Sequence, residues 1–289
     1  MVKATLAVLA LLVVIAGGVA AHDRQHANDS GKSVKSAQTT SSQKTKPKPQ
    51  IEPALQTAWQ AALAGTTTPV DIAVYDHGTG ETAHYSTVAA HTYNTASIMK
   101  LSILENLLLT NQQQGTAGLT QSQLADAAPM IEHSDNDAAT ALWQLEGGTS
   151  SLDSFFQKID ATQTSAGQAS LWGLTQTTAL DQLKVVNELA YPKLLNAASV
   201  QVADTLLDNV ESDQRWGVSG GVPSGVTVRL KNGWLDYNGW TVNSIGHVQG
   251  NGTDYTIAVL TDGDATEQTG INLIQALSTA TWKYLSGLS

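Results

Sequence analysis

Cysteine is absent from all 289 residues of the sequence. This absence excludes disulfide bonds, thiolate metal sites, a cysteine nucleophile and a lipidated N-terminal cysteine. The histidines form no His-Glu-x-x-His motif and show no metal-ligand spacing, and the glycines form no phosphate-binding loop. We therefore expect neither a metal ion nor another cofactor.

Basic residues are scarce in most of the chain. Seven of the 15 Lys and Arg residues precede residue 51, whereas only two of the 25 Asp and Glu residues do. Residues 51–289 therefore hold eight basic and 23 acidic residues, a net charge of −15. This charge argues against binding to nucleic acid, because phosphate contacts require clustered cations.

The first 50 residues divide into two segments. Residues 1–21 contain Lys3, an uncharged apolar run and the small residues Val19-Ala20-Ala21, which is typical of a signal peptide or a membrane anchor. Residues 22–50 are rich in Ser, Gln, Thr, Lys and Pro and predict a flexible spacer. We expect an exported monomer, extracellular, wall-associated or anchored through its N-terminus. The basic spacer either contacts an anionic wall or membrane surface or only provides reach and solubility.

Residues 51–289 predict one α+β domain with an α/β/α arrangement. A helix at Ile51–Ala64 precedes two alternating strands within residues 70–86, and three more strands begin near Val226 before a C-terminal helix. This order indicates a five-stranded antiparallel sheet built from residues 51–93 and 213–289 and flanked by the two terminal helices. Residues 94–212 have helical periodicity and predict an inserted all-α subdomain.

Ser97 and Lys100 lie one turn apart at the start of a strongly apolar helix, which we expect to be capped by Asn94 or Thr95. The buried setting should desolvate Lys100 and favour its neutral form, as a general base requires. Ser-x-x-Lys alone is weak evidence, because polar residues are ordinary at helix starts.

Two further motifs follow in order, Ser134-Asp135-Asn136 between two predicted helices and Lys231-Asn232-Gly233 at a predicted strand end. Each has a simpler explanation. Ser134 or Asp135 can cap the next helix, and a strand lysine is most often exposed.

Together the three motifs resemble those of the penicillin-recognising serine enzymes, and most closely the class A β-lactamases. The resemblance covers residues 51–289, although Asn232 replaces the usual Thr or Ser. It implies that Ser97 attacks an acyl carbonyl, Lys100 helps to remove its proton, and Ser134 with Lys231 protonates the leaving nitrogen. It also implies that Asn136 binds the side-chain amide of the substrate. Lys231 and Asn232 would bind the substrate carboxylate.

The resemblance implies two further features. The backbone N–H groups of Ser97 and Trp234 would form an oxyanion hole. Arg215 resembles an arginine that assists carboxylate binding, although a structural salt bridge is a simpler explanation.

One family feature is missing. Class A β-lactamases carry a glutamate after the second motif that activates the deacylating water, but residues 161–180 contain no carboxylate. Three readings stay open: a β-lactamase-type hydrolase that deacylates slowly, a D,D-carboxypeptidase or peptidoglycan acyl-transferase, and a non-catalytic wall-binding module. The expected ligand is a β-lactam or a peptidoglycan-type peptide.

Overall fold

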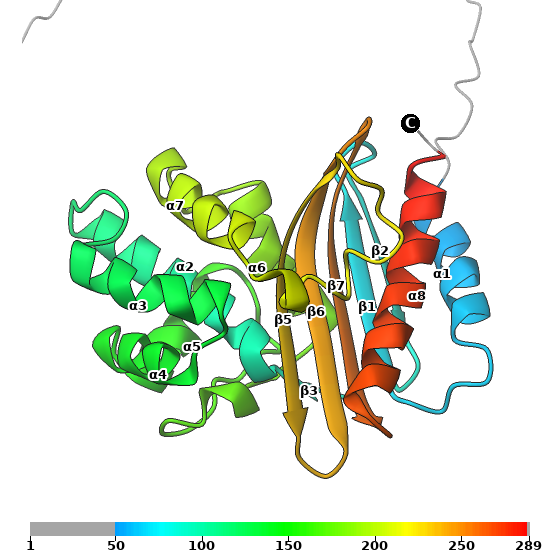
Figure 1. Ribbon diagram of the computed structural model, residues 1–289, viewed down its shortest axis with the longest axis horizontal. Helices are drawn as coiled ribbons and strands as arrows, with labels where there is room; N and C mark the ends of the chain where they lie inside the picture. The colour runs from blue at the N-terminus through cyan, green and yellow to red at the C-terminus, as the bar shows by residue number, and fades with distance from the viewer. Residues whose placement is uncertain (1–49, 288–289) are drawn as a thin grey trace, which may run out of the picture. The chain divides into compact units, whose positions relative to one another are not determined.

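A computed structural model describes residues 50–287, so the predicted signal peptide and nearly all of the predicted spacer lie outside the described residues. The centre of this part is a five-stranded sheet in the order β2-β1-β7-β6-β5, with every neighbouring pair antiparallel (Figure 1). The predicted five-stranded antiparallel sheet is therefore confirmed. Its strands are β1 (Val70–Asp76), β2 (Glu81–Ser86), β5 (Thr227–Asp236), β6 (Trp240–Gly250) and β7 (Thr253–Asp264).

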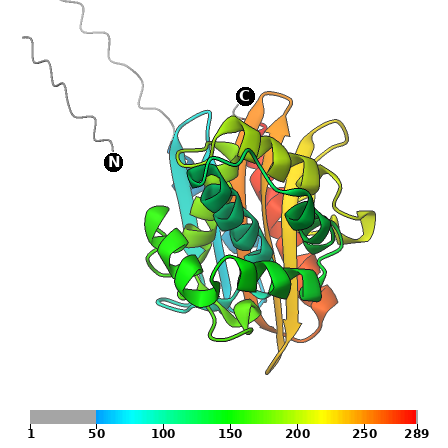
Figure 2. The same ribbon diagram turned by 90° about the vertical axis from the view of Figure 1, so that its left-hand side faces the viewer.

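Helices cover both faces of the sheet (Figures 1 and 2). The two terminal helices, α1 (Ile51–Ala62) and α8 (Glu267–Leu285), pack side by side on one face. On the other face α6 (Ala179–Ala190) packs against β1, β6 and β7. Beyond it lie the remaining helices, which are α2 (Met99–Gln113), α3 (Gln121–Glu132), α4 (Asn136–Leu145), α5 (Gly148–Lys158) and α7 (Ala197–Asp208).

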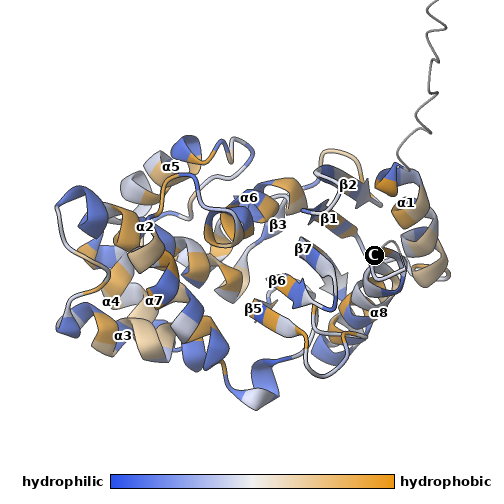
Figure 3. Cartoon of the chain, turned by 90° about the horizontal axis from the view of Figure 1, so that it is seen from above, coloured by the Kyte–Doolittle hydropathy of each residue, from blue (hydrophilic) through white to orange (hydrophobic). Residues whose placement is uncertain are grey.

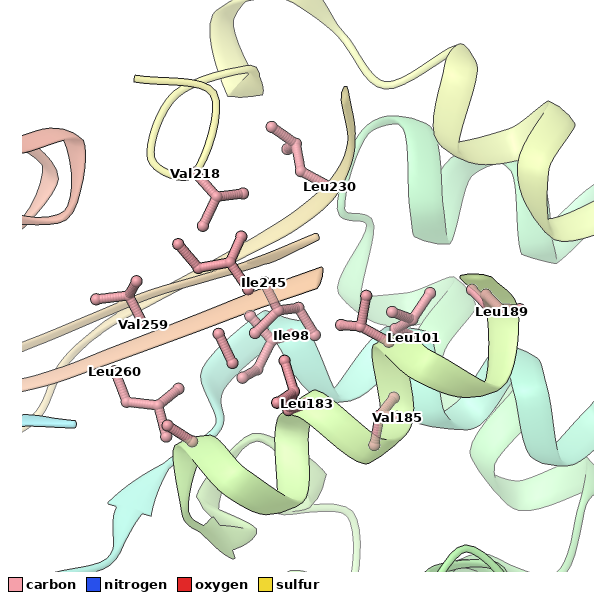
Figure 4. Close-up of a cluster of buried hydrophobic side chains, with 14 of the residues drawn as sticks. Ile98, Leu101, Leu183, Val185, Leu189, Val218, Leu230, Ile245, Val259 and Leu260 are labelled. Carbon is pink, nitrogen blue, oxygen red and sulfur yellow. The ribbon is translucent and has the colours of Figure 1, made fainter. Parts of the chain in front are cut away.

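The core is continuous from the sheet to the inner helices, and apolar residues line the space between them in Figure 3. Twelve of the 15 residues of α2 are buried, which confirms the prediction that this helix is enclosed nearly all round. Figure 4 shows how the start of α2 packs against α6 and the sheet. Ile98, just before α2, and Leu101 lie among Leu183 and Leu189 of α6 and Ile245 of β6. Burial of this kind fixes the start of α2 relative to the sheet edge.

Five short elements connect the sheet to the helices and were not predicted. Two strands, β3 (Tyr93–Asn94) and β4 (Gln176–Thr177), pair with each other across 82 residues of chain. Two single 3₁₀ turns, η1 (Ala96–Ile98) and η2 (Trp172–Leu174), lie beside this pair, and a third, η3 (Ser212–Gln214), precedes β5. The pairing holds the segment before α2 against the segment before α6.

The predicted cap of the Ser97 helix is wrong. Neither Asn94 nor Thr95 caps it through a side chain. The chain instead enters α2 through η1, and Ala96 adopts a left-handed conformation with φ of 47°. A non-glycine residue rarely adopts such a conformation, so the surrounding structure must hold it there.

Trp59 generates a test of the packing between α1 and α8. Its side chain is fully buried, and its Nε1 donates a 2.9 Å hydrogen bond to Thr281 Oγ1 on α8. We expect Trp59→Ala to lower the free energy of unfolding by about 3–5 kcal/mol, because the cavity cannot be filled. Trp59→Phe should cost about 1–2 kcal/mol, since most of the apolar volume remains. Urea unfolding followed by circular dichroism measures both, and equal costs for the two variants would contradict this account.

Candidate active site

The predicted nucleophile and its neighbouring lysine meet at the junction of η1 and α2. Ser97 is half-buried in η1, and Lys100 lies in the first turn of α2 with none of its surface exposed. Lys100 Nζ donates to Ser97 Oγ at 2.9 Å. This distance allows direct proton transfer between the hydroxyl and a neutral amine.

The second motif closes around the same amine. Lys100 Nζ also lies 2.6 Å from the Ser134 carbonyl oxygen, 3.0 Å from Ser134 Oγ and 2.7 Å from Asn136 Oδ1. Ser134 has a φ of 57°, which turns both of its oxygens toward Lys100. The cap of α4 is instead Asp135, whose Oδ1 accepts from Ala138 N at 2.8 Å. Ser134 and Asp135 thus have separate roles.

The third motif reaches the site from the edge strand β5. Lys231 is only 1% exposed, and its Nζ lies 3.0 Å from Ser134 Oγ and 3.0 Å from the Asn232 carbonyl oxygen. The expectation that most strand lysines are exposed therefore does not apply here. Ser134 Oγ stands between two ammonium or amine groups that belong to different elements.

Burial changes the proton affinity of both lysines. Desolvation lowers the pKa of Lys100 to about 7, and the nearby Asp135 carboxylate opposes this change. Desolvation, reinforced by the charge of Lys100, holds the pKa of Lys231 well below its usual range. Because two cations this close repel each other, the site favours states in which at least one lysine is neutral.

The strand and the nucleophile turn touch at Gly233. A Cβ atom at this position would lie 2.6 Å from Ser97 N and 2.7 Å from Ile98 N, which no side chain could tolerate. Glycine therefore permits β5 to pass directly beside η1. The two backbone N–H groups predicted for the oxyanion hole, those of Ser97 and Trp234, belong to these adjoining segments.

Asn232 points away from the lysines. Successive side chains of a strand face opposite sides of the sheet, so Lys231 and Asn232 diverge. Asn232 Nδ2 donates to the carbonyl oxygens of Gln214 at 2.7 Å and Trp216 at 3.1 Å, and its Oδ1 accepts from Ser244 Oγ at 2.6 Å. The predicted contact with a substrate carboxylate would require these amide donors to leave their present partners.

Arg215 binds two backbone carbonyl groups in this structure. Its guanidinium donates to the carbonyl oxygens of Val228 at 2.6 Å and Leu207 at 3.5 Å, which joins the end of α7 to β5. It forms no ion pair within residues 50–287, so the alternative of a structural salt bridge is wrong. By contrast, the exposed Asn136 has no partner for its Nδ2 among the described residues and could donate to a ligand.

The structure adds one residue to the site that the sequence did not single out. Trp172, in η2, places its ring centroid 5.0 Å from Lys100 Nζ. It lies within residues 161–180, the region that contains no carboxylate. The available signal in the sequence was a large aromatic residue in this region.

Within residues 50–287, no three His, Asp or Glu side chains are placed to hold a metal ion. No described helix is long and apolar enough to cross a membrane.

Comparison with known proteins assigns the chain to a family. Residues 109–285 match the beta-lactamase enzyme family. A putative lipoprotein, LppW, of Mycobacterium tuberculosis is 26% identical over 184 residues, which are 61% of this chain and 56% of that protein. The chain thus spans little more than half the length of this curated relative.

Two solved structures share the fold. A class A beta-lactamase from Bacteroides cellulosilyticus superposes with a TM-score of 0.72 at 16% identity, over 83% of this chain and 100% of that one. A beta-lactamase from Streptosporangium roseum gives 0.69 at 15% identity, over 81% and 98%. Since the family match covers well over half of the sequence and the sheet and helices follow the same fold, the chain belongs to the beta-lactamase enzyme family.

Proposed function

We propose that the protein is an exported serine hydrolase that forms an acyl-enzyme on Ser97 with β-lactams or related acyl-D-amino-acid substrates. The observation that carries this proposal is the 2.9 Å contact between Ser97 Oγ and the buried amine of Lys100, whose pKa is lowered to about 7. A neutral amine at this distance can accept the hydroxyl proton as the nucleophile attacks.

The proposed acylation step involves Ser97, Lys100, Ser134 and two backbone N–H groups. Ser97 Oγ bonds to the acyl carbon while its proton passes to Lys100 Nζ, and the backbone N–H groups of Ser97 and Trp234 stabilise the oxyanion. The amide C–N bond then breaks, and the leaving nitrogen takes the Ser134 hydroxyl proton. Lys100, whose Nζ lies 3.0 Å from Ser134 Oγ, then passes the proton that it took from Ser97 to Ser134, and Lys231 Nζ lies at the same distance from that hydroxyl oxygen.

Export and surface contact are also proposals. The predicted signal segment supports export, and the name of the mycobacterial relatives, putative lipoprotein LppW, agrees with export. We further propose that the basic spacer, with six Lys or Arg residues and two Asp residues, contacts anionic wall or membrane material, and that the protein is a monomer.

The first prediction is covalent labelling of Ser97. Incubation with a fluorescent penicillin should add one label per chain, and Ser97→Ala should remove it. Ser41→Ala is the matched control, because Ser41 and Lys44 form the second Ser-x-x-Lys pair of the sequence and should not react. Intact-protein mass spectrometry measures the adduct. If folded protein stays unlabelled at high penicillin concentration, the protein is not a β-lactam-reactive enzyme.

The second prediction concerns the protonation of Lys100. Because the neutral amine is the proton acceptor, the acylation rate constant should rise with pH and level off above the lowered pKa of about 7. About a tenfold rise between pH 6 and pH 8 follows from this titration. Lys100→Arg should nearly abolish acylation, since guanidinium stays protonated. Lys158→Arg, an exposed lysine of α5, is the control and should change nothing.

The third prediction concerns turnover. No carboxylate in residues 161–180 is available to activate water, and general-base assistance is typically worth about 10² to 10⁴ in rate. A chromogenic β-lactam should therefore give a burst of about one equivalent, followed by slow release. Stopped-flow absorbance measures the burst, and fast steady turnover without a burst would show that another residue supplies the base.

A second candidate function rests on the same missing carboxylate. An acyl-enzyme that resists water can persist until an amine acceptor arrives, as in a peptidoglycan acyl-transferase, whereas a D,D-carboxypeptidase passes the acyl group to water after D-alanine has left. Brisk release of D-alanine from a stem-peptide mimic, together with slow β-lactam turnover, would favour this function. Failure of Ser97 to react with either substrate would favour the third alternative, a non-catalytic wall-binding module.

A further inference from the structure

Trp172 occupies one side of the Lys100 amine. Its ring centroid is 5.0 Å from Lys100 Nζ, and only 8% of the residue is exposed. The other neighbours of the amine are polar and come from two motifs: Ser97 Oγ, both oxygens of Ser134, and Asn136 Oδ1. The indole is thus the apolar wall of an otherwise polar centre.

The indole is held in this position from two directions. Its Nε1 donates to Thr140 Oγ1 of α4 at 3.2 Å. Its own segment is fastened to the nucleophile turn, because Thr95 N donates to Thr175 O at 2.9 Å and Thr95 Oγ1 to Gly173 O at 3.5 Å. Gly173 also lies beside Ala96, since a Cβ atom at Gly173 would be 3.7 Å from Ala96 Cα, an ordinary van der Waals contact. These contacts join the Trp172 segment to η1.

This placement has a chemical consequence. The ring carries one hydrogen-bonding atom, Nε1, and that atom is already committed to Thr140. An aromatic face can neither hold a water in a defined position nor accept its proton.

The two carboxylates that contact this loop are occupied elsewhere. Asp153 Oδ1 accepts from Ala166 N at 2.9 Å, and Asp181 Oδ2 accepts from Gln163 N at 2.7 Å. Both stabilise the loop backbone. Among the described residues, neither forms a hydrogen bond with Ser97, Lys100 or Ser134.

We propose that Trp172 is a positioning residue that excludes water from the Lys100 side of acylated Ser97 and so prolongs the life of the acyl-enzyme. Deacylation requires a water oxygen to bond to the acyl carbon, the Ser97 Oγ–C bond to break and the water proton to reach Ser97 through a base. Trp172 blocks the approach from which Lys100 could act as that base. This inference rests on the proposed acylation of Ser97.

The test measures acylation and deacylation separately in the full-length protein, with a fluorescent penicillin as the probe. Trp172→Ala should still be acylated at Ser97 and should release the product at least tenfold faster. Its release rate should also rise with pH through the titration of Lys100, because water can now reach the amine. A purely structural role would not create this pH dependence. Trp172→Ala and Trp172→Gln both remove the ring and are the two opening variants. Trp172→Gln retains more volume and serves if Trp172→Ala fails to fold. It should also release product faster.

Three controls isolate the ring. Trp172→Phe keeps an aromatic wall and should retain slow release, as should Thr140→Val, which removes only the acceptor of Nε1. Trp143→Ala removes a half-buried tryptophan that packs against Gly148, and should leave the release rate unchanged.

The outcomes separate this inference from the proposed function. Absence of labelling in the wild-type protein would refute the proposed reaction of Ser97 with β-lactams. Normal labelling with unchanged release in both opening variants would overturn the role of Trp172 and leave the acylation mechanism intact. Equally fast release by Trp172→Phe would overturn it as well, since the ring would then not be the barrier.

Discussion

The buried amine of Lys100 is the interaction on which the rest of the site depends. It has four oxygen neighbours within 3.0 Å, supplied by Ser97, Ser134 and Asn136. To bring these oxygens together, the chain adopts left-handed conformations at both Ala96 and Ser134. Such conformations cost about 1–3 kcal/mol each and persist only where the surroundings compensate for them.

The sheet edge must also come close, and this requirement explains Gly233. Any side chain there would collide with the backbone of Ser97 and Ile98, so the position must be glycine if Lys231 is to reach Ser134 Oγ. The same strand geometry separates Lys231 from Asn232, whose amide fastens the loop at Gln214 and Trp216. On β5, Lys231 therefore faces Ser134, whereas Asn232 faces the loop that precedes the strand.

The sequence predicted the regular part of this protein well. Periodicity located the sheet strands and the major helices, because each buries one regular face or, in α2, nearly its whole surface. It did not predict η1, the β3–β4 pair or the role of Trp172. These depend on contacts between segments about 80 residues apart, and local periodicity carries no information about them. The side-chain directions of Asn232 and Arg215 were missed although their partners lie only 8 to 18 residues away in the chain, because residue spacing does not show which backbone carbonyl a side chain meets.

The burial of Lys100 and Lys231 helps to distinguish an enzyme from a module that only binds a ligand. Lys100 and Lys231 are at most 1% exposed, and both hydrogen bond to the same serine hydroxyl. Burying two amines together is costly, and apolar side chains of similar volume would often stabilise a fold better. A module that only bound ligands would not need this pair. Water exclusion by Trp172 fits the same reasoning, because a dry, partly neutral lysine is suited to removing a proton from Ser97. Under the proposed mechanism, the environment that equips the chain for acylation is therefore also the environment that keeps water away from the ester.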